Sequence, residues 1–490
     1  MQANSRDEVV IAGGGPTGMM LAAELALAGA GVTIAERRPD QELAGSRAGG
    51  FHSRTIELFD QRGVTDRFLA EGQTVQAGFL GGAPLEMGDF PTRHPYTLAI
   101  FQREIERIMA AWIAELPVRV LYGSEVTGFA QDQDGVDVEL SSGEPLRARY
   151  LVGCDGGRSV VRKAAGIEFP GWEATRSNLI AEVELTEEPP SGVHHDAVGV
   201  HGVQPLEDGR ARVVTTEREI GSGGEPALGD LSDALIAAFG TDFGAHSPTW
   251  ISRFTDATRQ AAEYRAGRVL LAGDSAHVHY PVGGQGLSLG VQDAVNLGWK
   301  LAQVVKGTAP ESLLDTYREE RHPVAARALR YTMAQTALQR RDERVQAVVE
   351  VIAPVVGMDE PRRHLAGLHS GLDIHYPLGD GHPLLGRRMP DLDLHTEDGP
   401  LRAFELLHGA RPVLINLGEP GSFEIGGWAD RVQLIDAGRD GAWELPVIGA
   451  VTAPTAVLVR PDGYVAWTGG SAEPGLDEAL LRWFGPASAP

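Results

Sequence analysis

The chain has 490 residues, of which 42% are hydrophobic and 22% charged, and its formal net charge at pH 7 is −24. This length predicts two or three domains with sizeable cores, and the composition is that of an ordinary soluble globular protein. The negative charge excludes nucleic acid and an anionic membrane surface as partners, because both require a basic protein face.

The N-terminal segment has the order of a dinucleotide-binding unit. An apolar run at 9–12 is typical of a buried parallel strand, and it leads into GGGPTG at 13–18, which fits G-x-G-x-x-G. A helix is predicted over 19–28, followed by a strand over 32–35 that ends at Glu36. Such a unit binds a pyrophosphate at the helix N-terminus and a ribose at the terminal acid.

Residues 37–171 are predicted to complete this first domain. Arg47 precedes glycines, so it is expected either to reach a phosphate or to be a solvated surface arginine. Residues 74–101 contain short apolar runs separated by Gly and Pro, which predicts strands that leave the first domain. A helix is then expected over 101–116.

Two later segments repeat the arrangement of strand, turn and helix. At 150–165 an apolar strand runs into a turn that begins with Asp155, and a helix follows. At 268–305 a strand runs into Gly-Asp274, then a glycine-rich loop and a long helix. Both carboxylates are expected at the carboxyl edge of the sheet, where open α/β sheets bind ligands. A glycine-rich loop that leads into a helix is also an anion site.

Two histidines of the 268–305 segment and the single cysteine carry side chains that could be reactive. His277 and His279 suit acid–base chemistry by type, but the interpretation that they line the loop or cap its turns is favoured. Cys154 is expected to pack in its strand as a small hydrophobe. One cysteine excludes an internal disulfide framework and a C-x-x-C site, so a cytoplasmic location is expected and no metal site is predicted.

The pattern changes twice more along the chain. Short alternating runs predict an antiparallel sheet, and a long helical stretch is predicted over 310–355. A Pro- and Gly-rich linker then precedes strands and a terminal helix, which predict a small α/β domain without cysteine. The predicted domains are 1–171 with 267–376, an inserted substrate-binding sheet domain at 172–266 to which 74–101 contributes, and a C-terminal domain at 377–490.

Together, GGGPTG with Glu36, CDGGRSVVRKAAG at 154–166 and RVLLAGDSAHVHYPVGGQGLSLGVQDAVNLGWKL at 268–301 resemble the group A flavoprotein monooxygenases. The resemblance is closer to the aromatic polyketide hydroxylases, such as those that act on angucyclines and tetracyclines, and extends to 46–63 and 370–392. It implies an α/β fold of the para-hydroxybenzoate hydroxylase type. This fold has a Rossmann-like FAD-binding domain, an inserted antiparallel-sheet substrate domain and a C-terminal thioredoxin-like domain.

The resemblance also implies non-covalent FAD, with NADPH or NADH as reductant. It assigns cofactor contacts to Gly13, Gly15, Pro16, Thr17, Gly18, Glu36, Arg37, Arg47, Gln102, Val126, Asp155, Asp274, Pro281, Gly284, Gly286, Leu287 and Ser288. Pro281 would face the flavin, and no catalytic base is assigned. Ser288 stands where relatives usually carry Asn, which puts a side-chain contact with the flavin in question. Pro454 matches a cis-proline of thioredoxin-like folds, so a cis Ala453–Pro454 bond is expected.

The implied function is hydroxylation of a polycyclic aromatic polyketide or related phenol by O2, through a flavin C4a-hydroperoxide; a homo-oligomer is compatible with it. One alternative is Baeyer–Villiger insertion, or modification of an antibiotic such as a rifamycin, by the same fold. Another is a non-catalytic flavoprotein that binds a polyketide intermediate. A flavin halogenase is disfavoured because the chain has no W-x-W-x-I-P segment.

Overall fold

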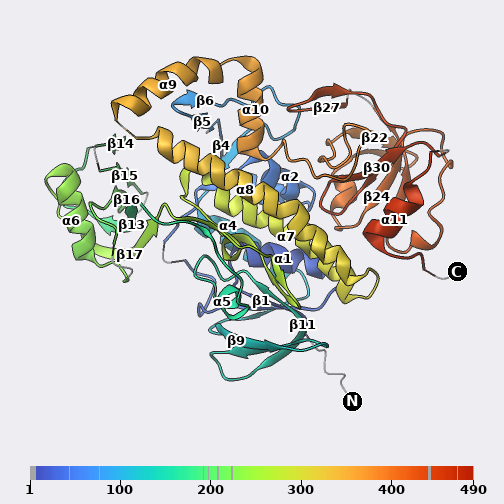
Figure 1. Cartoon of the computed structure of the whole chain (residues 1–490), viewed down its shortest axis with the longest axis horizontal. Helices are drawn as coiled ribbons and strands as arrows, with labels where there is room; N and C mark the ends of the chain where they lie inside the picture. The colour runs from blue at the N-terminus through green and yellow to red at the C-terminus, as the bar shows by residue number, and fades with distance from the viewer. Residues whose placement is uncertain are drawn as a thin grey trace.

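The computed structural model describes residues 7–488 apart from 44, 77, 191, 197, 207–208, 222–223, 341, 440–442 and 472. Helices α7 (Gln285–Val305) and α8 (Asp315–Leu338) cross the middle of the molecule. A parallel sheet lies below them in Figure 1, a second sheet lies at one end and a C-terminal lobe at the other. No helix of the described chain has both the length and the apolar character needed to cross a bilayer.

An eight-stranded sheet carries the predicted phosphate loop. Its order is β19-β20-β11-β1-β2-β8, and β10 and β9 continue from β11. Strands β20, β11, β1, β2 and β8 run parallel, so their carboxyl ends meet at one edge. The bounds are β1 (Asp7–Ala12), β2 (Val32–Ala35), β8 (Val118–Leu121), β9 (Val126–Gln131), β10 (Val136–Leu140), β11 (Leu146–Gly153), β19 (Arg265–Ala266) and β20 (Val269–Leu271).

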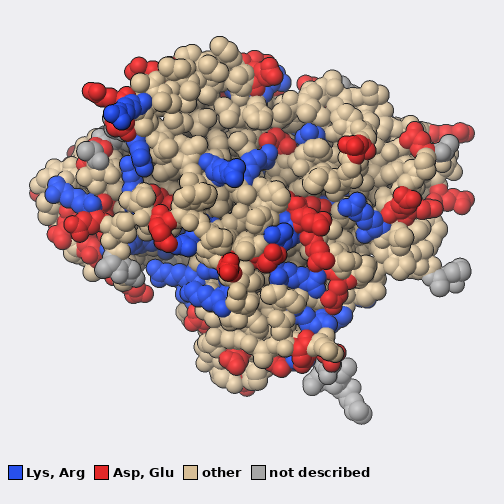
Figure 2. All heavy atoms as spheres, in the orientation of Figure 1, with Lys and Arg blue, Asp and Glu red and all other residues tan. Residues whose placement is uncertain are grey.

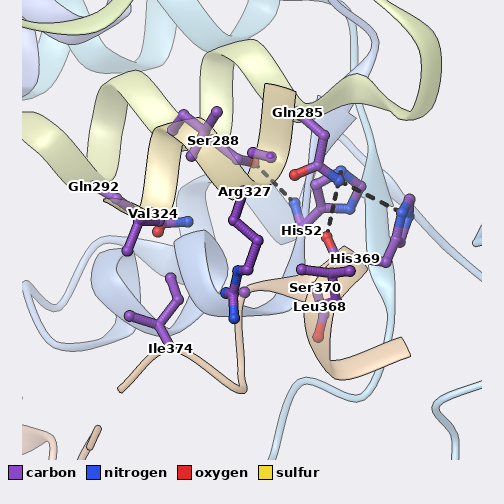
Figure 3. Close-up of a pocket in the computed structure, with 13 residues that line it drawn as sticks. His52, Gln285, Ser288, Gln292, Val324, Arg327, Leu368, His369, Ser370 and Ile374 are labelled. Carbon is purple, nitrogen blue, oxygen red and sulfur yellow. Dashed lines mark hydrogen bonds between the residues drawn. The ribbon is translucent and has the colours of Figure 1, made fainter. Parts of the chain in front are cut away.

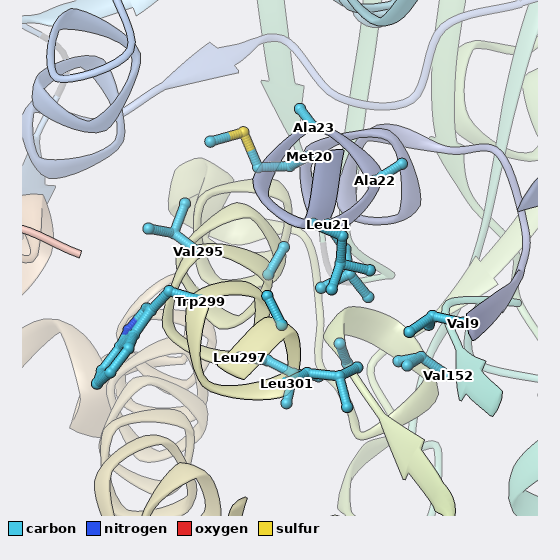
Figure 4. Close-up of a cluster of buried hydrophobic side chains, with 14 of the residues drawn as sticks. Val9, Met20, Leu21, Ala22, Ala23, Val152, Val295, Leu297, Trp299 and Leu301 are labelled. Carbon is cyan, nitrogen blue, oxygen red and sulfur yellow. The ribbon is translucent and has the colours of Figure 1, made fainter. Parts of the chain in front are cut away.

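Helix α1 (Pro16–Leu27) packs along α7 above this sheet, and apolar side chains such as Leu21 and Leu297 fill the contact (Figure 4). The helices approach closely because α7 has a glycine at the crossing. A Cβ on Gly298 would lie 2.4 Å from Cβ of Glu24, so a larger residue would push the two helices apart. Helix α4 (Gln102–Ala114) packs against α1 as well.

The second sheet has five antiparallel strands in the order β14-β15-β16-β13-β17. Odd-numbered residues of β13, such as Leu179 and Ala181, pack with Leu231 and Leu235 of α6. The strand period of two therefore turns Ile180 to the opposite face. The longest strand, β17, was not singled out by the sequence because it starts with polar residues. The bounds are β13 (Ser177–Glu184), β14 (Gly192–His195), β15 (Val200–Pro205), β16 (Ala211–Thr216), β17 (His246–Thr255) and α6 (Leu228–Phe239).

The stretch predicted to be helical over 310–355 is two helices. Helix α8 ends at Leu338, and α9 (Glu343–Val356) starts behind Asp342, whose side chain accepts a hydrogen bond from Val345 N and caps the new helix. A further helix, α10, and short elements from the region around 50–100 lie beside them. Their bounds are α10 (Asp359–Ser370), α2 (Ser53–Asp60), α3 (Thr65–Leu69), β3 (Gly50–Phe51), β4 (Gln73–Val75), β5 (Phe79–Leu80), β6 (Ala83–Pro84) and β7 (Thr97–Ala99).

The C-terminal lobe is built on a sheet of order β25-β24-β29-β30, in which only β24 and β25 are parallel. The bounds are β24 (Val413–Asn416), β25 (Gln433–Asp436), β29 (Ala456–Val459), β30 (Val465–Gly469) and α11 (Leu476–Phe484). The expected cis Ala453–Pro454 bond is wrong, because no described peptide bond is cis. The trans form is favoured by about 0.5–1 kcal/mol unless a tight turn requires otherwise, and here the chain runs directly into β29.

The turn between β29 and β30 inserts into the body of the molecule through buried charges. Arg460 Nη1 donates to Glu320 Oε1 of α8 at 2.6 Å, and Lys300 Nζ of α7 donates to Glu320 Oε2 at 2.9 Å. Asn296 Nδ2 donates to Asp462 Oδ2 at 3.1 Å. All of these side chains are at most 3% exposed, so the lobe is joined to α7 and α8 by a fully buried ionic network.

Candidate functional site

A cavity of about 1280 Å³ lies between the carboxyl edge of the parallel sheet and the five-stranded sheet. Almost every residue to which the sequence assigned a cofactor contact lines it. These residues are Gly13, Gly15, Pro16, Thr17, Glu36, Arg37, Arg47, Gln102, Val126, Asp155, Asp274, Pro281, Gly284, Gly286 and Leu287. The two exceptions are Gly18 and Ser288.

The three motif glycines have different surroundings. Gly13 has φ +105°, and a Cβ there would lie 2.4 Å from the carbonyl oxygen of Cys154. A Cβ on Gly18 would lie 2.0 Å from the carbonyl oxygen of Gly13, so Gly18 serves packing and does not face the cavity. By contrast, no atom lies within 4 Å of a Cβ built on Gly15, which caps α1 without a side-chain hydrogen bond. The free amides of α1 therefore face open space, as an anion site requires.

Glu36 belongs to a network that organises the edge of the cavity. Its Oε2 accepts from Gly14 N at 2.6 Å, and its Oε1 accepts from Arg38 N at 2.9 Å. Arg38 Nη1 also donates to Glu106 Oε2 at 2.9 Å, and Gln102 Nε2 donates to Glu106 Oε1 at 2.8 Å. Burial raises the pKa of Glu106 against the opposing effect of Arg38. Two acids and one arginine thus hold the loop after β2 and the start of α4 together.

Four arginines that line the cavity lack a carboxylate partner among the described residues: Arg37, Arg47, Arg158 and Arg212. Arg47 Nη2 donates to Ser252 Oγ of the five-stranded sheet, so it is not a solvated surface arginine. Burial lowers the pKa of Arg47, and Asp274 partly offsets this effect. In a chain of net charge −24, such a cluster is a local anion site. On the face shown in Figure 2, basic side chains gather where the two sheets meet, and acidic side chains lie beside them and across the rest of the face.

The two acids predicted at the sheet edge differ in their surroundings. Asp155 Oδ2 accepts from Val160 N at 2.7 Å, and its Oδ1 accepts from Ser275 Oγ at 2.9 Å, so its carboxylate holds the start of α5 (Val160–Ala164). Asp274 is exposed to the cavity and accepts no hydrogen bond from any described residue. Of the two, Asp274 has the carboxylate that is free to bind a ligand.

The two histidines near Asp274 also differ. His277 does not line the cavity: its Nε2 lies 2.7 Å from Asp293 Oδ2, and Arg321 Nε donates to Asp293 Oδ1 at 2.7 Å. Burial alone would raise the pKa of Asp293, but Arg321 and His277 hold it below its usual range. His279 lines the cavity, and its Nδ1 donates to Tyr280 O at 2.7 Å. His277 is thus a structural residue of this loop, whereas the Nε2 atom of His279 has no hydrogen-bond partner among the described residues, so its role as a loop residue stays a prediction.

The first turn of α7 faces the cavity on one side and a smaller cavity on the other (Figure 3). Gly284 caps the helix at φ +67° without a side-chain hydrogen bond, so the amides of this turn are free. The Ser288 side chain does not line the large cavity, in line with the question raised about its contact with the flavin: its Oγ accepts from His52 N at 3.2 Å, on the side of the smaller cavity. The serine side chain is shorter than asparagine, and its hydroxyl accepts a hydrogen bond from the start of α2. The Ser288 side chain therefore does not face the large cavity.

The other half of the large cavity is apolar and aromatic. Ile180, Val200, Val214 and Phe254 line it from the five-stranded sheet, and Phe254 lies 5.8 Å from the ring of Tyr280. This half of the cavity therefore suits a flat hydrophobic molecule. The volume exceeds the roughly 300–1,000 Å³ of a single small-molecule pocket, which leaves space for two ligands.

Sequence reasoning missed several cavity residues. Arg38 and Arg158 adjoin predicted site residues, and Glu106 follows Gln102 by one helical turn, so a search for helical neighbours would have found it. Tyr280 adjoins the predicted site residue Pro281, whereas Phe254 carried no signal, because only the fold brings β17 to the loop before α7.

Comparison with known proteins is consistent with this geometry. Residues 6–332 match the family model described as FAD binding domain, and 382–487 match the one described as aromatic-ring hydroxylase, C-terminal. The chain is 45% identical to the 12-dehydrotetracycline 5-monooxygenase/anhydrotetracycline 6-monooxygenase of Streptomyces rimosus, over 98% of this chain and 99% of that protein. It is 43% identical to the rifampicin monooxygenase of Streptomyces venezuelae, over 98% and 99%.

Solved structures agree with these matches. The chain superposes on the anhydrotetracycline hydroxylase OxyS of Streptomyces rimosus with a TM-score of 0.92 at 44% identity, covering 99% of this chain and 100% of that one. It superposes on the Diels–Alderase PyrE3 of pyrroindomycin biosynthesis with a TM-score of 0.83 at 36% identity, covering 98% and 100%.

Proposed function

Because the chain belongs to the FAD-dependent aromatic-ring hydroxylases, a family of monooxygenases, we propose that it hydroxylates a polycyclic aromatic polyketide or a related phenol. NADPH or NADH would be the reductant and O2 the oxidant. One observation carries the proposal: a single cavity joins an open phosphate loop and a free helix N-terminus to an apolar, aromatic wall.

The residues present fit FAD. The open position at Gly15 and the uncapped N-terminus of α1 suit a pyrophosphate, which Arg47 would help to neutralise. Glu36 keeps acceptor capacity for a ribose hydroxyl, because a carboxylate has about four lone-pair sites. Asp274 has no described hydrogen-bond donor and would accept from the ribityl chain.

When bound, the flavin would supply electron transfer from NAD(P)H and the activation of O2. The free amides in the first turn of α7 would stabilise negative charge on the reduced ring through hydrogen bonds and the helix dipole. The apolar wall with Phe254 and Tyr280 would hold the substrate ring and exclude water. No acid–base residue of this chain is required for the oxygen transfer.

The same proposal extends to the domains. We assign cofactor binding to 1–171 with 267–376, and substrate binding to 172–266 together with 74–101. The C-terminal lobe at 377–490 would be a thioredoxin-like domain; its mixed four-stranded sheet and its helix α11 support this assignment. With no cysteine, it would serve packing or subunit contact and not thiol chemistry.

The test is oxygen incorporation. Purified protein loaded with FAD would be incubated with NADPH or NADH under ¹⁸O2 and a panel of polycyclic phenols, followed by mass spectrometry. We expect a product that carries one ¹⁸O atom, and NAD(P)H consumption that the phenol stimulates. NAD(P)H oxidation without stimulation and without labelled product would contradict the proposal and favour a non-catalytic flavoprotein. Ring expansion in the labelled product would indicate Baeyer–Villiger insertion.

A second function is favoured by the likeness to PyrE3, a relative named for a Diels–Alder reaction. In that case the FAD-loaded cavity would act as a template, and the product would have the mass of its substrate. Chromatographic separation before the mass spectrometer distinguishes the two functions, because a cyclised isomer would elute apart from its substrate at the same mass and would form without NAD(P)H or O2.

A further inference from the structure

One histidine from a distant part of the sequence holds the first turn of α7. His52 Nε2 lies 2.7 Å from Gly283 O, and since a carbonyl can only accept, this nitrogen carries the proton and donates. His52 N donates to Ser288 Oγ at 3.2 Å. The residue is 4% exposed. It therefore ties the start of α2 to the loop before α7 through Gly283, and to the helix itself through Ser288, the contact visible in Figure 3.

The loop that His52 holds, Val282–Gly284, is a single 3-10 turn, and the next residue, Gln285, is held by its Nε2, which donates to His369 O at 2.9 Å. Gly283 and Gly284 are consecutive left-handed residues with φ +70° and +67°. Glycine adopts this conformation freely, but it also leaves it freely. Because α7 has no side-chain cap, the direction of its free amides depends on these two glycines. A hydrogen bond that fixes the Gly283 carbonyl therefore also fixes the direction in which the free amides of α7 point.

We propose that His52 is a positioning residue for the oxygen-transfer site: its hydrogen bond to Gly283 aims the free amides of α7 at the flavin ring. The inference rests on the proposed function and deepens it. It also accounts for Ser288, whose hydroxyl supports His52 from the other side and does not contact a ligand. Burial keeps His52 neutral at pH 7 by lowering its pKa to about 4, so it holds the loop without adding a charge.

The test compares two amide variants of different reach. Glutamine places its amide near the position of Nε2 and can still donate to Gly283, whereas asparagine reaches only the position of Nδ1. We expect His52→Asn to weaken FAD binding about tenfold, whereas His52→Gln stays within about twofold of wild type. The midpoint potential of bound FAD should fall by about 30 mV in His52→Asn, the equivalent of tenfold for two electrons. Fluorescence titration and equilibrium redox titration measure these values.

His375 provides a matched control, because its Nε2 also donates to a carbonyl, Leu385 O at 3.0 Å, away from both cavities. His375→Asn should leave the FAD dissociation constant and the potential unchanged. The proposal is overturned if His52→Asn behaves as wild type, or if His375→Asn shows the same shifts. If His52→Asn does not fold, Ser288→Ala provides the test. We expect it to shift both values in the same direction by a smaller amount, and the absence of any shift would overturn the proposal. Neither readout needs a substrate, so absence of hydroxylated product would count against the proposed function alone.

Discussion

Two regions of the molecule contain the same kinds of charged residue: the contact between the C-terminal lobe and helices α7 and α8, called the junction, and the large cavity. They differ in whether these residues have oppositely charged partners. At the junction, Arg460, Lys300 and Glu320 are buried, and each has oppositely charged partners. In the cavity, Arg158 and Asp274 have no ion-pair partner among the described residues. Both side chains are exposed, so water solvates their charges at little cost, and they remain free to pair with a ligand. The burial of a charge, and not the residue type, therefore decides whether it needs a partner within the protein.

The largest expected effect lies at the junction. Arg460→Met should lower the free energy of unfolding by about 3–5 kcal/mol, because the buried Asp462 would lose its cation and the buried Glu320 would keep only Lys300. Urea denaturation measures this. The control is Arg67→Met, which breaks the exposed pair with Glu115 and should cost less than about 1 kcal/mol. Equal losses in the two variants would mean that the buried network does not dominate the junction.

The next effect is a pH dependence of the unfolding free energy that arises from His52, which lines the smaller cavity. The pKa of His52 is lowered from 6.5 to about 4 by burial, so the unfolded chain takes up a proton before the folded protein does. Its stabilising contribution is complete above pH 6.5 and is lost as the pH falls toward 4, by about 3 kcal/mol at most. His369 and Arg327 line the same small cavity, and His52→Gln leaves them in place. Below pH 6.5, the unfolding free energy of the wild type should therefore fall more steeply with decreasing pH than that of His52→Gln. Parallel curves of unfolding free energy against pH would contradict this prediction.

A ligand-dependent effect is expected at Asp274. Asp274→Ala should weaken FAD binding by one to two decades, roughly 1.5–3 kcal/mol, because it removes a charged acceptor. The unfolding free energy of the FAD-free protein should not change, since no described residue depends on this carboxylate for a hydrogen bond. Fluorescence titration and urea denaturation of the same samples separate the two quantities. An unchanged dissociation constant would remove Asp274 from the proposed site.

The smallest effect is expected at Arg158, an exposed residue at the cavity wall. Arg158→Gln should raise KM for NADPH or the dissociation constant of FAD by up to about fivefold, and high salt should reduce the difference. Steady-state kinetics at two salt concentrations test this. A larger effect that persists in high salt would show that Arg158 is desolvated in the complex.

The parts of the site that sequence could predict are those set by neighbours along the chain. Gly13 and Glu36 follow strands directly, and Asp274 lies in the turn just after β20, so strand period and turn chemistry place them. His52 is separated from Gly283 by more than 200 residues, and no local pattern records that contact. The cis bond at Pro454 was wrong for a related reason, because a pattern shared by a fold does not fix one peptide bond in a loop.

The insertion of the β29–β30 turn has a consequence for recombining this chain with its relatives. Arg62 pairs with Glu24 of α1 and donates to Pro461 O in the same turn, so the lobe is keyed to the helix that starts the chain. A chimera that exchanges only the segment after 377 would bring foreign side chains against Glu24 and Glu320. C-terminal lobes should therefore be exchangeable only between relatives that both carry Glu24 and Glu320 at these positions. A crossover placed in the linker before 377 would otherwise lower the stability of the chimera.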